Sequence, residues 1–450
     1  MTHVALSTRT RVDDVAQNAS VANVGSVTVP RPRHDALDLL RGVALFGILV
    51  VNLQFFANPV YDAGANALDA SPLARVAAWL IAFAFEAKFF VLFSFLFGYG
   101  VAVQLARGDE ESGRTTAVTP THAAPAPGDA RPSGAGRRHA RRLVGLLAFG
   151  VVHATLLFVG DILVSYALFG AALWWVRAWS PRRLVRLAIA CLAVAIVGHA
   201  AIVVVTSLPA MSDTQAMRAL AEEATRSYRG GFGDAMRQRV RDLAVFYLFT
   251  PLFNWPTIAA MFALGLAAGK IGFARDLVRH RPTLRRWLPV ALVVGIVGNV
   301  AYASFTDVPA GASTARALLG AVSFIGLALA GPALASVYAY VVIAMDGRPQ
   351  WGRRLAPVRA AGRMSLTNYL GQAICASVLF NGYGFAWYGR VGANGLLAIA
   401  VVLYAGQLAF STWWLRRFRL GPDEWLLRCW TEWRRVPLRR AIVAPAIERA

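Results

Sequence analysis

The stretch from residue 137 to residue 178 constrains the fold of this chain more than any other. It begins with four arginines within six residues and continues as two apolar runs, which Gly160 and Asp161 separate. Each run is about 18 residues long, close to the shortest helix that crosses roughly 30 Å of hydrocarbon. The pattern predicts two membrane spans joined by a very tight turn, with one histidine, His153, inside the first span.

Composition favours a membrane protein over a soluble or nucleic-acid-binding one. Of the 450 residues, 57% are hydrophobic and 16% are charged, whereas soluble domains carry about 25% charged residues. The formal net charge is +22, but the arginines gather between apolar runs, as they do in the cytoplasmic loops of membrane proteins. We therefore expect an all-α polytopic membrane helical bundle, with the lipid bilayer and no nucleic acid as a partner.

About ten transmembrane helices are expected. Besides the two spans in 137–178, apolar runs predict spans at about 39–57, 83–105, 184–208, 257–273, 287–304, 314–343, 364–382 and 395–415. Residues 73–82 and 243–256 are expected to lie at the membrane interface.

The arginine distribution predicts the orientation. Residues 1–36 are polar, which indicates a disordered cytoplasmic tail, and most arginine clusters fall in loops on one side of the ten-span arrangement. Both termini are therefore expected in the cytoplasm. The segment 209–241 is the exception, because it carries six arginines on the predicted outer side.

No sequence pattern indicates a metal or a bound cofactor. Cys191, Cys375 and Cys429 lie far apart, without the spacing of a metal site. The chain also has no Walker loop, glycine-rich nucleotide fingerprint or nucleophile motif. Any cofactor-like molecule is therefore expected to be a co-substrate.

Several polar residues in the spans are candidates for function. Arg41 lies three residues after Asp38, so the two either form an ion pair or leave Arg41 free to bind phosphate in a bidentate fork. Glu86 and Lys88 are two residues apart, point to different helix faces and need separate partners. Lys88 could also extend toward the interface. Asn368 shares a helix face with the glutamine four residues later.

His153 and Asp161 are the strongest candidates for chemistry. His153 lies about 17 Å along a helix from the start of its span, where a neutral imidazole could act as a general base. Asp161 is about 12 Å further and about 80° around an ideal helix, so one helix cannot join them. A dyad requires the chain to fold back at Gly160. The alternatives are a structural hydrogen bond for His153, and a helix cap or an acceptor contact for Asp161.

Four stretches in order resemble the YeiB-like family of bacterial multi-pass membrane proteins. They are LDLLRG at 37–42, FLFGYG at 95–100 with Glu86 and Lys88 before it, the element from His153 to Asp161, and the region from Gly362 to about Arg428. The resemblance covers nearly the whole chain after residue 35, apart from a low-complexity loop at 108–136. It implies a bacterial inner-membrane protein with an acyltransferase-like region at 37–345. A family-specific C-terminal domain with two spans and a basic tail would follow at 346–450.

The N-terminal region also resembles the broader transmembrane acyltransferases, which include heparan glucosaminide acetyltransferases. This resemblance implies transfer of an acyl group from cytoplasmic acyl-CoA to an acceptor beyond the membrane, such as a sugar hydroxyl or amine. In this interpretation His153 and Asp161 are the candidate catalytic residues, and Arg41, Glu86, Lys88 and Asn368 are the candidate substrate-binding residues. The alternative is a transporter of a small or amphipathic solute, although the chain shows no persuasive internal repeat.

Overall fold

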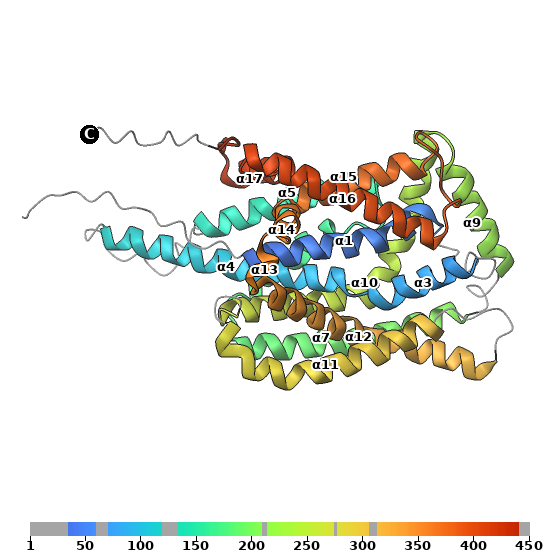
Figure 1. Ribbon diagram of the computed structural model, residues 1–450, viewed down its shortest axis with the longest axis horizontal. Helices are drawn as coiled ribbons and strands as arrows, with labels where there is room; N and C mark the ends of the chain where they lie inside the picture. Colours follow the sequence, from blue (N-terminus) through green and yellow to red (C-terminus); the bar gives the residue numbers. More distant parts are fainter. Residues whose placement is uncertain are drawn as a thin grey trace, which may run out of the picture. The chain divides into compact units, whose positions relative to one another are not determined.

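A computed structural model describes residues 35–59, 71–118, 134–208, 214–273, 277–305 and 313–440. Within these ranges the chain forms fifteen helices and no sheet, apart from one isolated bridge between Phe418 and Arg439. The all-α fold predicted from the sequence is confirmed (Figure 1). The expected tail at 1–36 lies almost wholly outside the described residues, as do residues 119–133 of the loop expected at 108–136. The two ends of that loop, 108–118 and 134–136, are helical and belong to the helices on either side.

The helices have the following bounds. They are α1 (Asp35–Ala57), α3 (Pro72–Ala84), α4 (Phe89–Val118), α5 (Gly134–Leu156), α6 (Leu163–Val176), α7 (Pro181–Thr206), α9 (Thr214–Tyr228), α10 (Phe232–Lys270), α11 (Leu277–Phe305), α12 (Thr314–Asp346), α13 (Pro349–Gly352), α14 (Ala356–Arg363), α15 (Ser365–Phe380), α16 (Ala393–Arg417) and α17 (Pro422–Glu432).

The helices are those of a multi-pass membrane protein. In the described part of the chain, six segments are long and apolar enough to cross a bilayer: α1, the α3–α4 segment to Ala106, α7, α11, α12 and α16. The bent helix α10 makes a seventh if its two halves form one span. The remaining three predicted spans fall on α5, α6 and α15, which are shorter or more polar. The count of ten therefore stays a prediction that depends on these three helices.

Two contacts between distant parts of the chain mark the two ends of the bundle. At the arginine-rich end, the Trp430 indole donates to the carbonyl of Arg141 at 2.7 Å, so α17 lies against the start of α5. At the opposite end, the Gly389 amide donates to the carbonyl of Ala57 at 2.6 Å. In Figure 1, α13, α14 and α17 lie at the first end and α9 lies at the second. Successive long helices run between these two ends.

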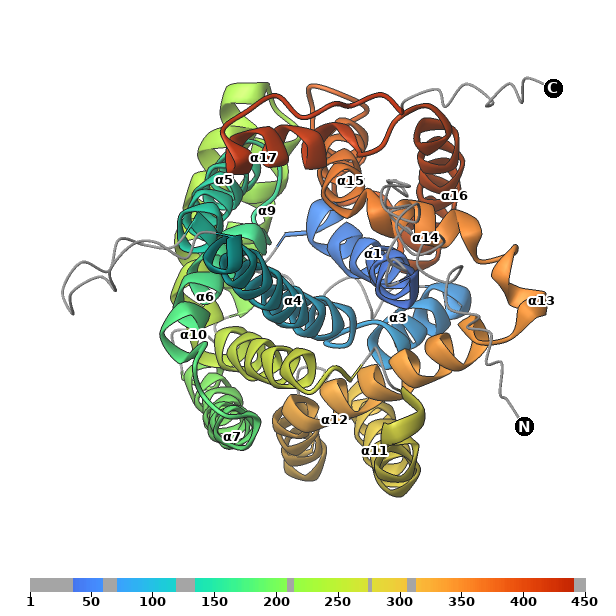
Figure 2. The same cartoon turned by 90° about the vertical axis from the view of Figure 1, so that its left-hand side faces the viewer.

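Helix α1 is the most buried span. Of its apolar window 61% is buried inside the protein, against 11% for α11. Figure 2 shows α1 among α3, α4, α14 and α15, while α7, α11 and α12 lie together on one side of α10. Because α1 carries the LDLLRG motif, this motif lies in the interior of the bundle.

Two glycines bring α1 and α14 into backbone contact. A Cβ atom on Gly42 would lie 2.1 Å from the carbonyl oxygen of Val358, and one on Gly362 would lie 1.8 Å from that of Asp38. Small residues allow such close approach of helices in membranes. The first and last motifs of the chain are therefore in direct contact.

The segment predicted to hold an interfacial part at 73–82 and a span from residue 83 consists of two helices with a short break between them, here called the broken span. Helix α3 ends at Ala84 and α4 begins at Phe89, with a turn between them in which Ala87 has a φ of 60°. Left-handed backbone is uncommon for a non-glycine residue and marks a local constraint. The break lies close to the expected boundary between residues 82 and 83.

Residues 243–256, expected to form an interfacial helix or a re-entrant segment, lie within α10 and not in a separate helix. Helix α9 lies at the end opposite the arginine-rich end, and α10 then runs for 39 residues from Phe232 to Lys270. It bends by 56° between Leu252 and Asn254. Two prolines inside this helix, Pro251 and Pro256, explain the bend, because each removes a backbone hydrogen bond.

The C-terminal motif supplies a cap for α15. This helix has no side-chain cap of its own. Glu424 of α17 accepts hydrogen bonds from the amides of Leu366 (2.6 Å) and Thr367 (3.2 Å), and from the Thr367 hydroxyl (2.7 Å). A carboxylate is favourable at a helix N-terminus, where amide donors are otherwise unpaired. The basic tail is thus packed onto the bundle.

Reporter fusions test the arrangement of the two ends. A reporter after residue 120 and one after residue 440 should both give cytoplasmic signals, because their segments adjoin the arginine-rich end. A reporter at residue 225, inside α9, should give the opposite signal. Paired phosphatase and fluorescent-protein fusions measure this. A cytoplasmic signal at residue 225 would contradict the ten-span topology.

Candidate functional site

The end of α5 is held by residues from three distant helices. Its last carbonyls accept hydrogen bonds from the Arg239 guanidinium, to Leu156 at 2.7 Å, and from the Ser377 hydroxyl, to Leu157 at 3.2 Å. Phe158 then stacks on Phe56 of α1, with ring centroids 4.1 Å apart. These contacts satisfy carbonyls that a helix end leaves open. They fix the reversal of the chain before α6.

This reversal brings His153 and Asp161 together. The Nδ1 atom of His153 lies 2.8 Å from Oδ1 of Asp161, and both side chains are almost completely buried. The other carboxylate oxygen, Oδ2, accepts from the amide of Val164 at 2.8 Å. The predicted fold-back at Gly160 therefore occurs. Asp161 also has the capping contact that the sequence left as an alternative.

Gly150 makes room for this carboxylate. It lies three residues before His153, on the same side of α5. A Cβ atom there would lie 2.6 Å from the Val164 amide nitrogen and 3.1 Å from Oδ2 of Asp161. Any larger residue at this position would displace the start of α6 and the aspartate with it.

The hydrogen bond to Asp161 decides which histidine nitrogen is available. A carboxylate accepts, so Nδ1 of His153 carries a proton, and in the neutral imidazole Nε2 then carries the lone pair. Nε2 is buried and has no hydrogen-bond partner among the described residues. A buried polar atom without a partner is rare and often marks a catalytic role or a missing ligand. The pair thus has the form of a general base held in its active tautomer.

Two tyrosine hydroxyls near the pair also lack partners. The ring of Tyr369, from α15, lies 4.9 Å from the His153 ring. Its hydroxyl lies near the backbone of Ile162 but meets no hydrogen-bond geometry within the described chain. The Tyr247 hydroxyl of α10 is likewise buried without a partner there, and it interacts electrostatically with Asp161. Unpaired buried donors and an unpaired acceptor therefore surround one small region.

Sequence reasoning missed Tyr369, Tyr247 and Arg239. Both tyrosines occur in apolar helices where an aromatic residue ordinarily indicates packing. Arg239 falls in the mixed-charge segment expected on the outer side of the membrane, and only 2% of it is exposed. The one sequence feature that could have pointed to Tyr369 is its position in the C-terminal stretch from Gly362 that resembles the family.

Arg41 forms the ion pair with Asp38 that was one of its two predicted roles. Its guanidinium lies 2.9 Å from the Asp38 carboxylate. Arg142 of α5 lies close enough to Arg41 for their charges to interact, and its guanidinium lies over the Phe97 ring at 5.4 Å. No carboxylate of the described residues lies within 4.0 Å of Arg142. The predicted phosphate contact would therefore involve Arg142 together with Arg41.

Glu86 and Lys88 have separate partners, as their spacing predicted. Glu86 accepts from the Tyr302 hydroxyl at 2.6 Å. The Lys88 ammonium donates to the carbonyl of Ala82 at 2.8 Å, and its side chain has no exposed surface. Lys88 therefore does not extend to the interface. It neutralises the carbonyl end of α3 inside the protein. Neither residue forms a hydrogen bond or ion pair with His153 or Asp161 in the described structure.

Asn368 belongs to a polar network between helices. Its amide donates to the Ala361 carbonyl and to the Ser411 hydroxyl, each at 3.0 Å. Gln372 donates to Gln407 at 2.9 Å, and Gln407 donates to the Asn368 carbonyl at 2.8 Å. These contacts join α14, α15 and α16. The geometry favours a structural role for Asn368 over the predicted substrate contact.

No group of three or more metal-ligating side chains occurs within the residues that the structure describes. The pair of His153 and Asp161 therefore has no third ligand of the usual kind nearby. The arrangement supports proton transfer by an imidazole whose orientation a carboxylate fixes.

Comparison with known proteins places the chain among proteins of the same size and type. Residues 268–434 match a family described as "Protein of unknown function (DUF418)". The chain is 31% identical to "Uncharacterized protein YxaH" of Bacillus subtilis (strain 168), over 89% of this chain and 94% of that protein. It is 28% identical to "Uncharacterized protein YeiB" of Escherichia coli (strain K12), over 93% and 99%.

The matches cover the whole bundle. The DUF418 region includes α11 and α12 as well as helices of the expected C-terminal domain, and the similarity to YxaH and YeiB extends far beyond it. The resemblance recognised in the sequence motifs is therefore confirmed, and the chain belongs to the YeiB-like family of multi-pass membrane proteins.

Proposed function

We propose that this protein is a transmembrane acyltransferase that moves an acyl group from acyl-CoA to a hydroxyl or amine acceptor. The observation that carries the proposal is the buried contact between His153 and Asp161, which leaves Nε2 of the histidine without a partner. A histidine that only packs between helices would not require a buried carboxylate beside it, and burying a carboxylate is costly. The resemblance to transmembrane acyltransferases supplies the reaction class.

The groups present suggest a role for each residue. Nε2 of His153 would accept the acceptor's proton as its oxygen or nitrogen attacks the thioester carbonyl. Asp161 would stabilise the resulting imidazolium through Nδ1. The Tyr369 hydroxyl would donate to the oxyanion of the tetrahedral intermediate. When the carbon–sulfur bond breaks, the imidazolium would return the proton to the leaving thiolate.

Acyl-CoA would enter from the arginine-rich end, which we place in the cytoplasm of a bacterial inner membrane. Arg41 and Arg142 would contact its phosphates, because guanidinium groups bind phosphate strongly. Along α5, Arg142 and His153 are about 17 Å apart, a distance that the extended thioester arm would have to cover. The acceptor, expected to be a saccharide, would reach His153 from the opposite side, and both termini would be cytoplasmic.

Asp161→Asn tests the histidine tautomer. An asparagine can accept from Val164 with its oxygen while its amide donates to Nδ1 of His153, which moves the imidazole proton to Nε2. Turnover should fall by about 10²- to 10⁴-fold while the melting temperature stays close to that of wild type. Thiol release from acetyl-CoA, with glucosamine as acceptor, measures turnover in nanodiscs.

His153→Gln should be equally inactive, because an amide forms hydrogen bonds but does not accept the proton. Thr155→Ala is a matched control, since this exposed hydroxyl bonds only the carbonyls of Val151 and Val152 in its own helix. Full turnover in either His153→Gln or Asp161→Asn would remove the pair from the mechanism.

Tyr369→Phe tests the oxyanion contact. It removes a hydroxyl that has no hydrogen-bond partner in the described structure, so stability should not fall. Loss of one oxyanion donor should lower turnover by about 10²- to 10³-fold. The control is Tyr404→Phe, whose hydroxyl donates to the Gly42 carbonyl at 2.7 Å. That variant should lose about 1 kcal/mol of stability and keep its turnover. The reverse pattern would assign Tyr369 to packing.

A transporter is the second candidate, and the broken span favours it. Transporters place buried charges at discontinuous helices, and here Lys88 and Glu86 flank a left-handed residue, Ala87. In this alternative Lys88 would carry or balance charge during transport. The dyad would then serve proton movement without acyl transfer.

Lys88→Arg separates the two functions. Lys88 has no exposed surface, and overpacking by a guanidinium should cost about 1 to 3 kcal/mol of stability. Lys270→Arg is the matched control, since Lys270 is the only other lysine of the chain and is exposed. For a transporter, a pH step across proteoliposomes should evoke a current in wild type and Lys270→Arg but not in Lys88→Arg. Thiol release from acetyl-CoA by a wild type that gives no current would exclude transport.

A further inference from the structure

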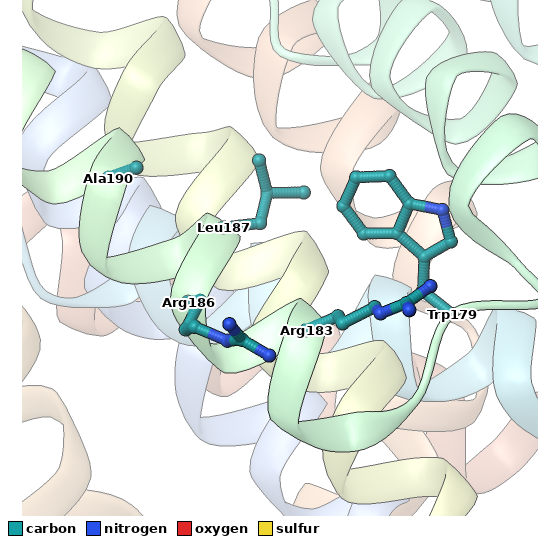
Figure 3. Close-up of a pocket in the computed structure, with 5 residues that line it drawn as sticks. All are labelled: Trp179, Arg183, Arg186, Leu187 and Ala190. Atoms are coloured by element: carbon teal, nitrogen blue, oxygen red, sulfur yellow. The ribbon is translucent and has the colours of Figure 1, made fainter.

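A pocket of about 400 Å³ lies where the loop after α6 meets the first turns of α7. Figure 3 shows the five side chains that line it. One wall is Trp179, from the loop before α7, and the helix supplies the others: Arg183, Arg186, Leu187 and Ala190. None of these residues belongs to the site of His153 and Asp161.

The pocket changes from charged to apolar along α7. Arg183, Leu187 and Ala190 are spaced four and three residues apart and so lie on one helix face. From Arg183 to Ala190 the helix rises by about 10 Å. A ligand in this pocket would therefore meet guanidinium groups at the helix start and only carbon further along the helix.

The positive charge of the pocket has no internal counter-charge. No carboxylate of the described residues lies within 4.0 Å of Arg183 or Arg186, and the sequence has no acidic residue between Asp161 and Asp213. Lys270 adds a third cation, since its ammonium donates to the Trp179 carbonyl at 2.9 Å. The pocket is complementary to an anion.

The apolar part of the pocket faces the hydrocarbon of the membrane. Only 22% of the apolar window of α7 is buried inside the protein. On the helix face that lines the pocket, Ala190 and, one turn further along, Val194 are exposed. Trp175, just before the pocket, is 76% exposed, as expected for an aromatic residue at the membrane interface. The arginines therefore lie at headgroup depth and Ala190 at the depth of acyl chains.

We propose that this pocket binds an anionic phospholipid. Arg183 and Arg186 contact the headgroup phosphate, and one acyl chain lies along Leu187 and Ala190 beside the Trp179 ring. Basic pockets between membrane helices are known to bind such headgroups. A soluble phosphate would use the arginines but would leave the apolar wall unoccupied, which favours the lipid.

Native mass spectrometry of the full-length protein tests the proposal. Detergent-purified protein is titrated with phosphatidylglycerol, with phosphatidylcholine of the same acyl chains, and with inorganic phosphate. Phosphatidylglycerol should give the strongest adduct. Each arginine near an anionic lipid contributes a similar part of the binding free energy. The double variant Arg183→Gln, Arg186→Gln should therefore bind phosphatidylglycerol about 10- to 30-fold more weakly.

Two further variants separate a specific pocket from general charge. Ala190→Phe fills the apolar end without changing the charge and should also weaken the phosphatidylglycerol adduct. The double variant Arg353→Gln, Arg354→Gln removes two exposed arginines beside a tryptophan at the same end of the bundle and should leave the adduct unchanged. Equal weakening by both double variants would overturn the proposal, as would equal binding of phosphatidylcholine or of phosphate alone.

Discussion

The two oxygens of the Asp161 carboxylate have separate partners, and the candidate site depends on both. One oxygen accepts from His153 near the end of α5, and the other accepts from the amide of Val164 at the start of α6. A buried carboxylate is tolerated only where such donors compensate its desolvation. The same group therefore closes the turn between two helices and sets the tautomer of the histidine. Fold and chemistry are coupled at this one side chain.

The sequence predicted the helices of this site, but it did not decide whether the chain folds back at Gly160 to bring the two side chains together. Apolar runs of span length and the Gly160–Asp161 interruption predicted two helices and a tight turn, because those features depend on local composition. A spacing of eight residues excluded a contact along one helix. Whether the chain folds back depends on Arg239, Ser377 and Phe56. These residues are distant in sequence, and local patterns contain no information about them.

The same limit explains the other candidate residues. Side-chain spacing predicted correctly that Glu86 and Lys88 need separate partners and that Asn368 shares a face with a glutamine, since spacing fixes direction on a helix. It could not identify those partners, which are Tyr302, the broken end of α3, and Ser411. The partner decides the role: the Asn368 amide is satisfied within the protein, whereas His153 keeps an unpaired nitrogen.

The expected boundary at residues 345 and 346 separates two stretches of sequence whose side chains meet at one site. Tyr369 lies after this boundary, yet its ring packs against His153, and Gly362 lies against the backbone of α1. Glu424 holds the start of the helix that carries Tyr369. The motifs at both ends of the chain therefore pack against each other, and the C-terminal one places Tyr369 beside His153. The site requires both stretches of sequence, because neither alone surrounds the histidine.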